Sequence, residues 1–174
     1  MVWGCMDWEG VGQLAEVEGR MNADQYVEIL ENHLLPSMEE SGIPLEDLIF
    51  QQGNDPKHTS RTAKAWIEDH KITVLDWPPN SPDVNPIEHL WGHIKKELVK
   101  YPIPPKGVWE LWERITEVWN NIEPGICQNL IESTPRRVEA VIKPREGIPS
   151  TEIITFCISD IILKYLSQWI PELK

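Results

Sequence analysis

The sequence of 174 residues contains few cysteines, and their positions suit neither cross-linking nor metal binding. Cys5, Cys127 and Cys157 are far apart and odd in number, so they predict neither a disulfide framework nor a zinc site. This pattern is typical of proteins in a reducing compartment.

Signals for export or membrane insertion are also missing. The first ten residues, MVWGCMDWEG, have neither the basic start nor the apolar centre of a signal peptide. The most apolar stretch, residues 153–170, is interrupted by Asp160, Lys164 and Gln168, which argues against a transmembrane span. We therefore expect an intracellular protein, nuclear or cytoplasmic, that does not use a membrane as a partner.

Positive charge is scarce. Lys and Arg together number 16 against 28 Asp and Glu, which gives a formal net charge of −12. Because phosphate binding depends on Lys and Arg, this balance argues against tight nucleic-acid binding by overall charge. Local basic patches remain, one over Lys57, Arg61 and Lys64 and another over residues 95–106. Each patch also fits an ordinary solvated helix face.

Apolar residues make up 41% of the sequence and include nine Trp, which is enough to build one domain with a real core. Short apolar runs alternate with helical patterns, and together they predict an α/β fold with a mixed sheet flanked by helices. The predicted order is a hairpin in 2–16, a helix after Asn22 that ends near Pro36, a strand in 45–52, a helix capped by Thr59 or Ser60, a strand over 72–75, a helix from Pro86, a helix from 108, and two short helices broken at Pro135.

The character of the sequence changes near Pro144. Residues 144–174 are rich in Ile and lack the Trp-containing helical pattern that precedes them. We divide the chain into a domain over 1–143 and a C-terminal tail over 144–174. Two interpretations of the tail stay open: it is a closing helix, or it does not belong to the domain.

Five segments, in order over residues 1–142, resemble the catalytic domain of Tc1/mariner transposases. They are MVWGCMDWEGVG, MNADQYVEILENHLLPS, FQQGNDPKHTSRTAKAWIEDH, VLDWPPNSPDVNPIEHLWGHIKKEL and IESTPRRVEAVI. The resemblance implies a ribonuclease H-like fold and a catalytic triad of two Asp and one Glu. It also implies two divalent ions, Mg²⁺ or Mn²⁺, held by the carboxylates, and DNA, the transposon ends, as the partner.

The triad of that family maps only in part onto this sequence. Glu88 in NPIEHLW falls on the family's Glu and is the expected catalytic and metal-binding residue. Gly53 stands where the family has its second Asp, with Asn54, His58 and Asn85 at other motif positions. The first Asp belongs to a strand upstream of residues 2–6, so we expect the ribonuclease H-like sheet to lack its first, central strand. Unpaired sheet edges would result, and poor folding with them.

Each of these residues has a structural interpretation as well. Glu88 and Asn85 have the form of a capping box at a helix start. Asp55 precedes Pro56 and suits a turn; it becomes a metal ligand only if that turn rearranges. His58 and Asn54 suit hydrogen bonds within the same turn. The pair of Arg136 and Arg137 is either a DNA contact, as in active relatives, or a solvated pair.

Three hypotheses for function follow. The first is a Tc1-like transposase domain whose ancestral reaction is Mg²⁺-dependent DNA strand cleavage and transfer, and which is catalytically defective because two triad residues are missing. The second is a non-catalytic module that binds nucleic acid, associates with itself or pairs with an intact transposase. The third is a relic without a function.

Overall fold

The computed structural model describes residues 1–77, 81–141 and 153–159, with side chains described through residue 138. Strands and helices alternate along the chain after an initial hairpin, as the sequence predicts. The elements are β1 (Val2–Met6), β2 (Val11–Glu16), α1 (Ala23–Ile29), the π-helix η1 (Leu30–Leu34), α2 (Leu35–Ser41), the 3₁₀-helix η2 (Leu45–Asp47), β3 (Leu48–Gln52), α3 (Arg61–Asp69), β4 (Thr73–Val74), the 3₁₀-helix η3 (Pro82–Val84), α4 (Pro86–Val99), α5 (Val108–Asn120), α6 (Pro124–Glu132), α7 (Thr134–Val141) and β5 (Ile153–Ser159).

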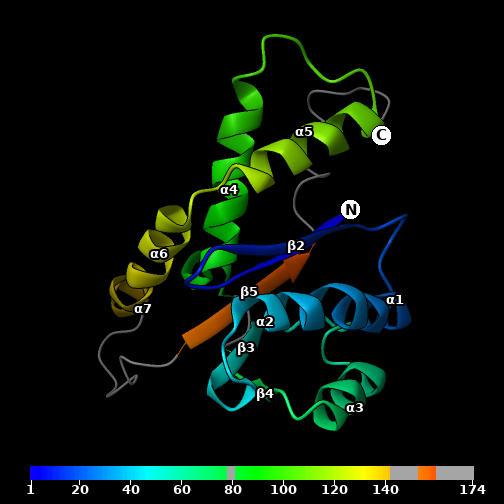
Figure 1. The fold of residues 1–174 in the computed structure, drawn as a ribbon, viewed down its shortest axis with the longest axis vertical. Coiled ribbons are helices and arrows are strands. Elements are labelled where there is room, and N and C mark those ends of the chain that lie inside the picture. Colours follow the sequence, from blue (N-terminus) through cyan, green and yellow to red (C-terminus); the bar gives the residue numbers. More distant parts are fainter. Residues whose placement is uncertain (78–80, 142–152, 160–174) are drawn as a thin grey trace.

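The strands form one mixed sheet in the order β2-β1-β5-β3-β4. β1 pairs antiparallel with β2, and β3 pairs parallel with β4. β5 pairs antiparallel with β1 and parallel with β3, so it occupies the centre of the sheet. Figure 1 shows α1, α2 and α3 on one side of this sheet and α4 and α5 on the other.

The predicted hairpin is confirmed. A bulge lies between Gly4 and Met6, where the register against β2 shifts by one residue. The connection is tightened by Asp7, whose carboxylate accepts the N–H groups of Glu9 and Gly10 at 2.8 and 3.1 Å. Gly10 has φ of 144°, a conformation that residues with a side chain rarely adopt.

The helix after Asn22 begins as predicted but runs further. Asn22 and Gln25 form a capping box at its start. The prediction that it ends near Pro36 is wrong, because η1 and α2 continue it to Ser41. Pro36 lies at the start of α2, directly after the π-helical turn, where a change in hydrogen-bond pattern accommodates its missing N–H.

Two apolar clusters cover the two faces of the sheet, because alternate strand residues point to opposite sides. Leu48 and Phe50 of β3 lie in the first cluster with Trp3 of β1, packed against α1 to α3. Val2 and Met6 of β1 lie in the second, packed against α4, α5 and α6. The chain therefore buries both faces, as a central mixed sheet requires.

The second cluster is organised by two tryptophans. Trp91 of α4 and Trp119 of α5 stack with ring centroids 5.3 Å apart, and both are buried. The indole N–H of Trp119 donates to the Gly12 carbonyl oxygen at 2.9 Å, which ties α5 to β2. These aromatic residues serve the core, as the sequence predicts.

The last part of the described chain departs from both interpretations of the tail. Residues 153–159 are neither a helix nor separate from the sheet; they form β5 between β1 and β3. The position that we expected to be empty in residues 1–143 is thus filled by a C-terminal strand. The run IITFCIS is rich in β-branched and aromatic residues, which favour strands. The rest of the tail lies outside the described residues.

The remaining elements agree with the sequence apart from two strand boundaries. The strand predicted over 45–52 begins only at Leu48, because Leu45–Asp47 form the 3₁₀-helix η2. The predicted strand over 72–75 is shorter, since β4 contains Thr73 and Val74 alone. The two short helices appear as α6 and α7, with Pro135 in the first turn of α7. In the described ranges, every helix falls short of the length or hydropathy needed to cross a membrane.

Candidate functional site

The first part of the site is the turn that follows β3. Gly53 comes directly after the last residue of the strand, and α3 begins eight residues later with Ser60 as its N-cap. His58 closes the turn from inside: its side chain is buried, and its Nδ1 lies 3.0 Å from the Gly53 carbonyl oxygen. Because a carbonyl oxygen can only accept, this hydrogen bond requires the proton on Nδ1, which then donates to the carbonyl. The predicted role of His58 as a hydrogen-bonding group of the turn is confirmed.

Asn54 connects this turn to the strand at the sheet edge. Its Nδ2 donates to the Trp77 carbonyl oxygen at 2.6 Å, just beyond β4. The backbone N–H of Leu75 donates to the Phe50 carbonyl oxygen at 2.8 Å and extends the same connection. Asn54 therefore connects the carboxyl ends of β3 and β4 by a structural hydrogen bond that leaves its own turn, whereas the sequence predicted a bond within the turn.

The carboxylate of Asp55 is engaged within the turn. Its Oδ1 accepts the backbone N–H of Lys57 at 3.0 Å, and its Oδ2 lies 3.1 Å from Lys57 Nζ. Partial burial raises the pKa of Asp55, but the hydrogen bonds and charge of Lys57 outweigh it, so the pKa is lowered overall. Asp55 is thus ionised and neutralised locally, which is the arrangement of a turn residue.

The second part of the site is the start of α4. Asn85 is 1% exposed and caps the helix, because its Oδ1 accepts the Ile87 N–H at 3.4 Å. Pro86 occupies the first turn, where a proline loses no helical hydrogen bond. The reciprocal capping bond from Glu88 stays a prediction.

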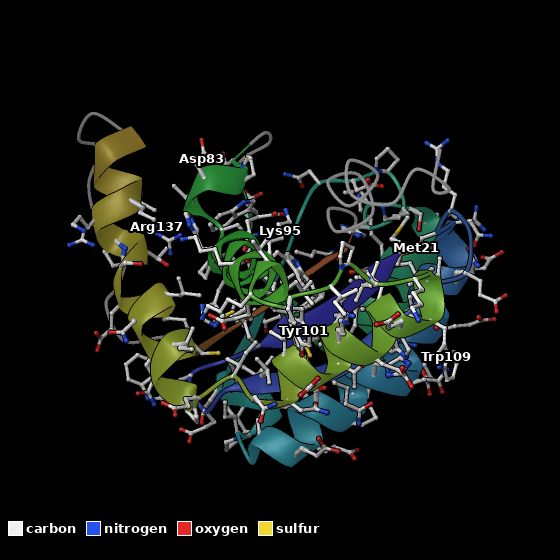
Figure 2. All side chains as sticks on the ribbon, turned by 90° about the horizontal axis from the view of Figure 1, so that it is seen from above. Met21, Asp83, Lys95, Tyr101, Trp109 and Arg137 are labelled. Atoms are coloured by element: carbon white, nitrogen blue, oxygen red, sulfur yellow. The ribbon has the colours of Figure 1, made fainter. Side chains whose placement is uncertain are left out.

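Glu88 lies in the first turn of α4 and is half-buried. The buried side chains of Ile87, Leu90 and Trp91 fix this turn against the second apolar cluster. Two helical turns further on, burial lowers the pKa of Lys95, and the negative charge of Glu88 opposes that effect. Glu88 therefore acts electrostatically on Lys95, along the α4 surface where Figure 2 labels this lysine.

The two arginines differ in their surroundings. Arg136 is exposed, whereas Arg137 is half-buried. Arg137 donates to the carbonyl oxygen of Leu130 at 2.6 Å and to the hydroxyl oxygen of Thr134 at 3.0 Å, which holds α7 to the end of α6. Figure 2 shows Arg137 beside these two helices. A DNA contact by either residue stays a prediction.

Sequence reasoning missed a polar group beneath the turn. The hydroxyl of Tyr26 donates to Gln52 Oε1, and the rings of Tyr26 and His58 lie 4.3 Å apart. The alternation of Leu48, Phe50 and Gln52 on one strand face was the signal available for it. On the opposite face Gln51 is fully buried, and its amide has no hydrogen-bond partner in the described part of the chain.

These residues do not fit a pair of divalent metal ions. Mg²⁺ and Mn²⁺ prefer oxygen ligands, and two such ions need several converging carboxylates. Gly53 supplies no side-chain oxygen, and the Asp55 carboxylate is held by Lys57. Across residues 1–77, 81–141 and 153–159, no group of three or more His, Cys, Asp or Glu side chains could hold a metal ion. No reaction step through a metal follows from this geometry.

Comparison with known proteins identifies the family of this chain. Residues 1–105, more than half of the chain, match the family model described as DDE superfamily endonuclease. The chain belongs to this DDE endonuclease family. Among its relatives is the transposable element Tc1 transposase of Caenorhabditis elegans, which is 36% identical over 143 residues. That alignment covers 82% of this chain and 50% of the relative, so the DDE chain spans about half the length of the transposase it matches.

Solved structures confirm the fold of this DDE domain. The Mos1 transposase catalytic domain with raltegravir and Mn superimposes with a TM-score of 0.68 at 22% identity, covering 79% of this chain and 71% of that one. The Mos1 transposase paired-end complex with the left transposon end gives the same TM-score and identity, covering 79% of this chain and 41% of that one. The mixed sheet is thus the ribonuclease H-like architecture that the sequence predicts. The Mn in the first of these structures supports the use of divalent metals in the family.

Proposed function

We propose that this chain is a Tc1-type transposase domain that does not cleave or join DNA by itself. The observation that carries the proposal is Gly53 directly after β3, because glycine has no side chain with which to bind a metal ion. Family resemblance assigns an Asp there, and Glu88 alone cannot neutralise two divalent ions.

The neighbouring carboxylate does not compensate. Asp55 would have to break its ion pair and its backbone hydrogen bond, both to Lys57, before its oxygens could bind a cation. The rest of the turn resists such a change, since His58 is buried and bonded to the Gly53 carbonyl oxygen. Loss of outer-shell partners alone typically costs ~10–100-fold in metal affinity or activity, and here a direct ligand is absent.

A nicking assay tests the proposal. Supercoiled plasmid is incubated with the 174-residue chain in Mg²⁺ and in Mn²⁺, and we expect relaxation no faster than in buffer alone. Two variants accompany it: Glu88→Ala removes the remaining triad carboxylate, and Asp83→Ala removes a carboxylate just before the same helix. Metal-dependent nicking that disappears in Glu88→Ala but persists in Asp83→Ala would refute the proposal.

A binding measurement separates lost metal affinity from lost turnover. We expect titration of the chain with Mn²⁺, followed by electron paramagnetic resonance of the free ion, to show equally weak binding for the unaltered chain and for Glu88→Ala. Tight binding that depends on Glu88 would show that the site still assembles around a metal. In that case the absence of nicking would have another cause.

A second function is non-catalytic binding of transposon-end DNA or of another transposase chain. It is supported by the ribonuclease H-like fold of the domain and by the exposure of Arg136 on α7. The net charge of −12 opposes tight binding, so we expect weak, strongly salt-dependent association. Fluorescence anisotropy with a labelled duplex at low salt tests it, with Arg136→Ala as the variant and Arg20→Ala, on an exposed loop, as the control. No detectable binding at low salt would refute the hypothesis that the chain binds DNA by itself. Either role places the protein in the nucleus or cytoplasm.

A further inference from the structure

β5 lies far from its neighbours in sequence, yet it is the strand on which the sheet depends. In the described chain, the β1–β2 hairpin and the β3–β4 pair are joined through the backbone of β5 alone. Four residues of β1 pair with β5, from Trp3 with Ser159 to Met6 with Phe156. Five residues of β3 pair with it, from Leu48 with Ile153 to Gln52 with Cys157.

The two edges that flank β5 have a defined polarity. β1 offers antiparallel pairing, while β3 offers parallel pairing. A strand between them must therefore run in one direction only. Both edges are also internal, since every residue of β1 is buried and Gln51 and Gln52 of β3 are buried with them.

Removal of β5 would leave these internal edges without partners. A buried N–H or C=O group without a hydrogen bond costs free energy comparable to a lost bond, and a row of them accepts a new strand readily. α4 packs against β5 on one face of the sheet, so the position is covered from that side as well. The rest of the fold thus presents a directional, partly enclosed place for one extended segment.

We propose that the paired edges of β1 and β3 form a strand-binding site and that residues 153–159 are its intramolecular ligand. The ligand class is an extended, apolar, β-branched peptide that runs parallel to β3. The covalent connection gives residues 153–159 a high effective concentration, so they occupy the site before the same segment of a second copy does. The inference is independent of the proposed function, because it concerns assembly of the sheet and no carboxylate.

The register supplies a direct test, because Cys5 of β1 and Cys157 of β5 are Cα partners. Directly opposed residues of antiparallel strands lie at Cα separations that a disulfide can span. In the full chain carrying Cys127→Ala, added diamide takes two electrons and two protons from the two thiols, and we expect one intrachain disulfide, seen by mass spectrometry of the monomer. A disulfide between two chains would overturn the intramolecular assignment.

A matched variant checks the register itself. Cys127→Ala combined with Cys157→Ser and Ile158→Cys moves the thiol by one residue, opposite Gly4. Neighbouring strand residues point to opposite faces, so we expect at least tenfold less disulfide to Cys5. Equal yields from the two variants would show that the segment is not held in this register.

Hydrogen exchange on the unaltered chain provides a measurement that needs no substitution. We expect amides of residues 153–159 to exchange on the order of 100-fold more slowly than in an unstructured peptide, together with the amides of β1 and β3. Rapid exchange in 153–159 beside slow exchange in β1 and β3 would overturn the proposal. In Thr155→Pro we expect the amides of β1 and β3 to lose their protection, and an added peptide of residues 151–161 to restore it. Ser150→Pro, which lies before the strand, should keep the protection of β1 and β3.

Discussion

Gly4 of β1 lies against the indole of Trp119, with no room between them for a larger residue. A Cβ atom built on Gly4 would lie 2.7 Å from Trp119 Cη2 and 3.0 Å from Cζ2. The ring cannot easily yield, because it stacks on Trp91 and its N–H bonds the Gly12 carbonyl oxygen. We therefore predict that Gly4→Ala forces α5 away from the hairpin and destabilises the fold.

The expected magnitude follows from two opposing effects. Favourable carbon contacts lie at ~3.5–4.0 Å, so the added methyl group would be about 1 Å too close. Overpacking of this kind costs ~1–3 kcal/mol, and replacing glycine in a strand returns ~0.5–1 kcal/mol of backbone entropy. We expect a net loss of about 1–2 kcal/mol in the free energy of unfolding.

Gly92 provides a matched control for the same chemical change. It lies inside α4, and a Cβ atom built there meets nothing within 4 Å. Gly92→Ala should therefore stabilise the chain by ~0.5–1 kcal/mol. Urea unfolding followed by far-ultraviolet circular dichroism gives both values at pH 7. If Gly4→Ala unfolds at the same or a higher urea concentration than the unaltered chain, the steric argument is refuted.

A double-mutant cycle assigns the cost of Gly4→Ala to the ring itself. Trp119→Phe removes the two atoms nearest to the added methyl group, and it also removes the hydrogen bond to Gly12. Trp119→Phe alone should therefore be less stable than the unaltered chain. Gly4→Ala should lower the free energy of unfolding less in the Trp119→Phe chain than in the unaltered chain. We expect a coupling energy of ~0.5–3 kcal/mol. Strict additivity would mean that the methyl group contacts something other than Trp119.

Three further predictions concern side chains near the site and in the core. Tyr26→Phe leaves the buried Gln52 oxygen without its donor and should cost ~1–3 kcal/mol in urea unfolding, much of which Gln52→Leu should recover; an unchanged midpoint would contradict this. Burial raises the pKa of the Cys127 thiol to about 12, so iodoacetamide at pH 8 should modify it in urea but not in the native chain. The pKa of Asp55 is lowered in the fold, so its pair with Lys57 stabilises the chain at neutral pH, and this stabilisation is lost as the pH falls below about 3.8, the ordinary value for Asp. The small stability advantage of the unaltered chain over Asp55→Asn at pH 7 should therefore shrink at acidic pH. An advantage that grows at acidic pH would contradict the lowered pKa.

Local sequence chemistry predicted the helix starts and the turn after β3. Asn22, Ser60 and Asn85 cap helices because their side chains satisfy N–H groups within three residues. The role of His58 followed from similar short-range hydrogen bonding, whereas the bond of Asn54 to Trp77 spans 23 residues and depends on the fold. The ending of the first long helix was missed because a π-helical turn before Pro36 depends on packing against the sheet, which no local pattern encodes.

The sequence predicted which residues make up the candidate site, but it did not predict which side chains contact one another. Glu88, Gly53 and Asp55 could be placed on a helix start and a strand end from their spacing. The ion pair of Asp55 with Lys57, the burial of Gln51 and the contact of Tyr26 with His58 could not, because they join side chains brought together by folding.

The sequence alone determined the family, the alternation of strands and helices, and the missing carboxylate at Gly53, because each depends on residue identity or short-range spacing. Only the tertiary structure decided that residues 153–159 form a strand between β1 and β3. β-Branched residues favour a strand, but the periodicity of a short apolar run does not distinguish a buried strand from a buried helix segment. The choice is made by the facing edges of β1 and β3, whose backbone groups need partners in a fixed direction. These edges lie about 100 residues or more from residues 153–159 in the chain.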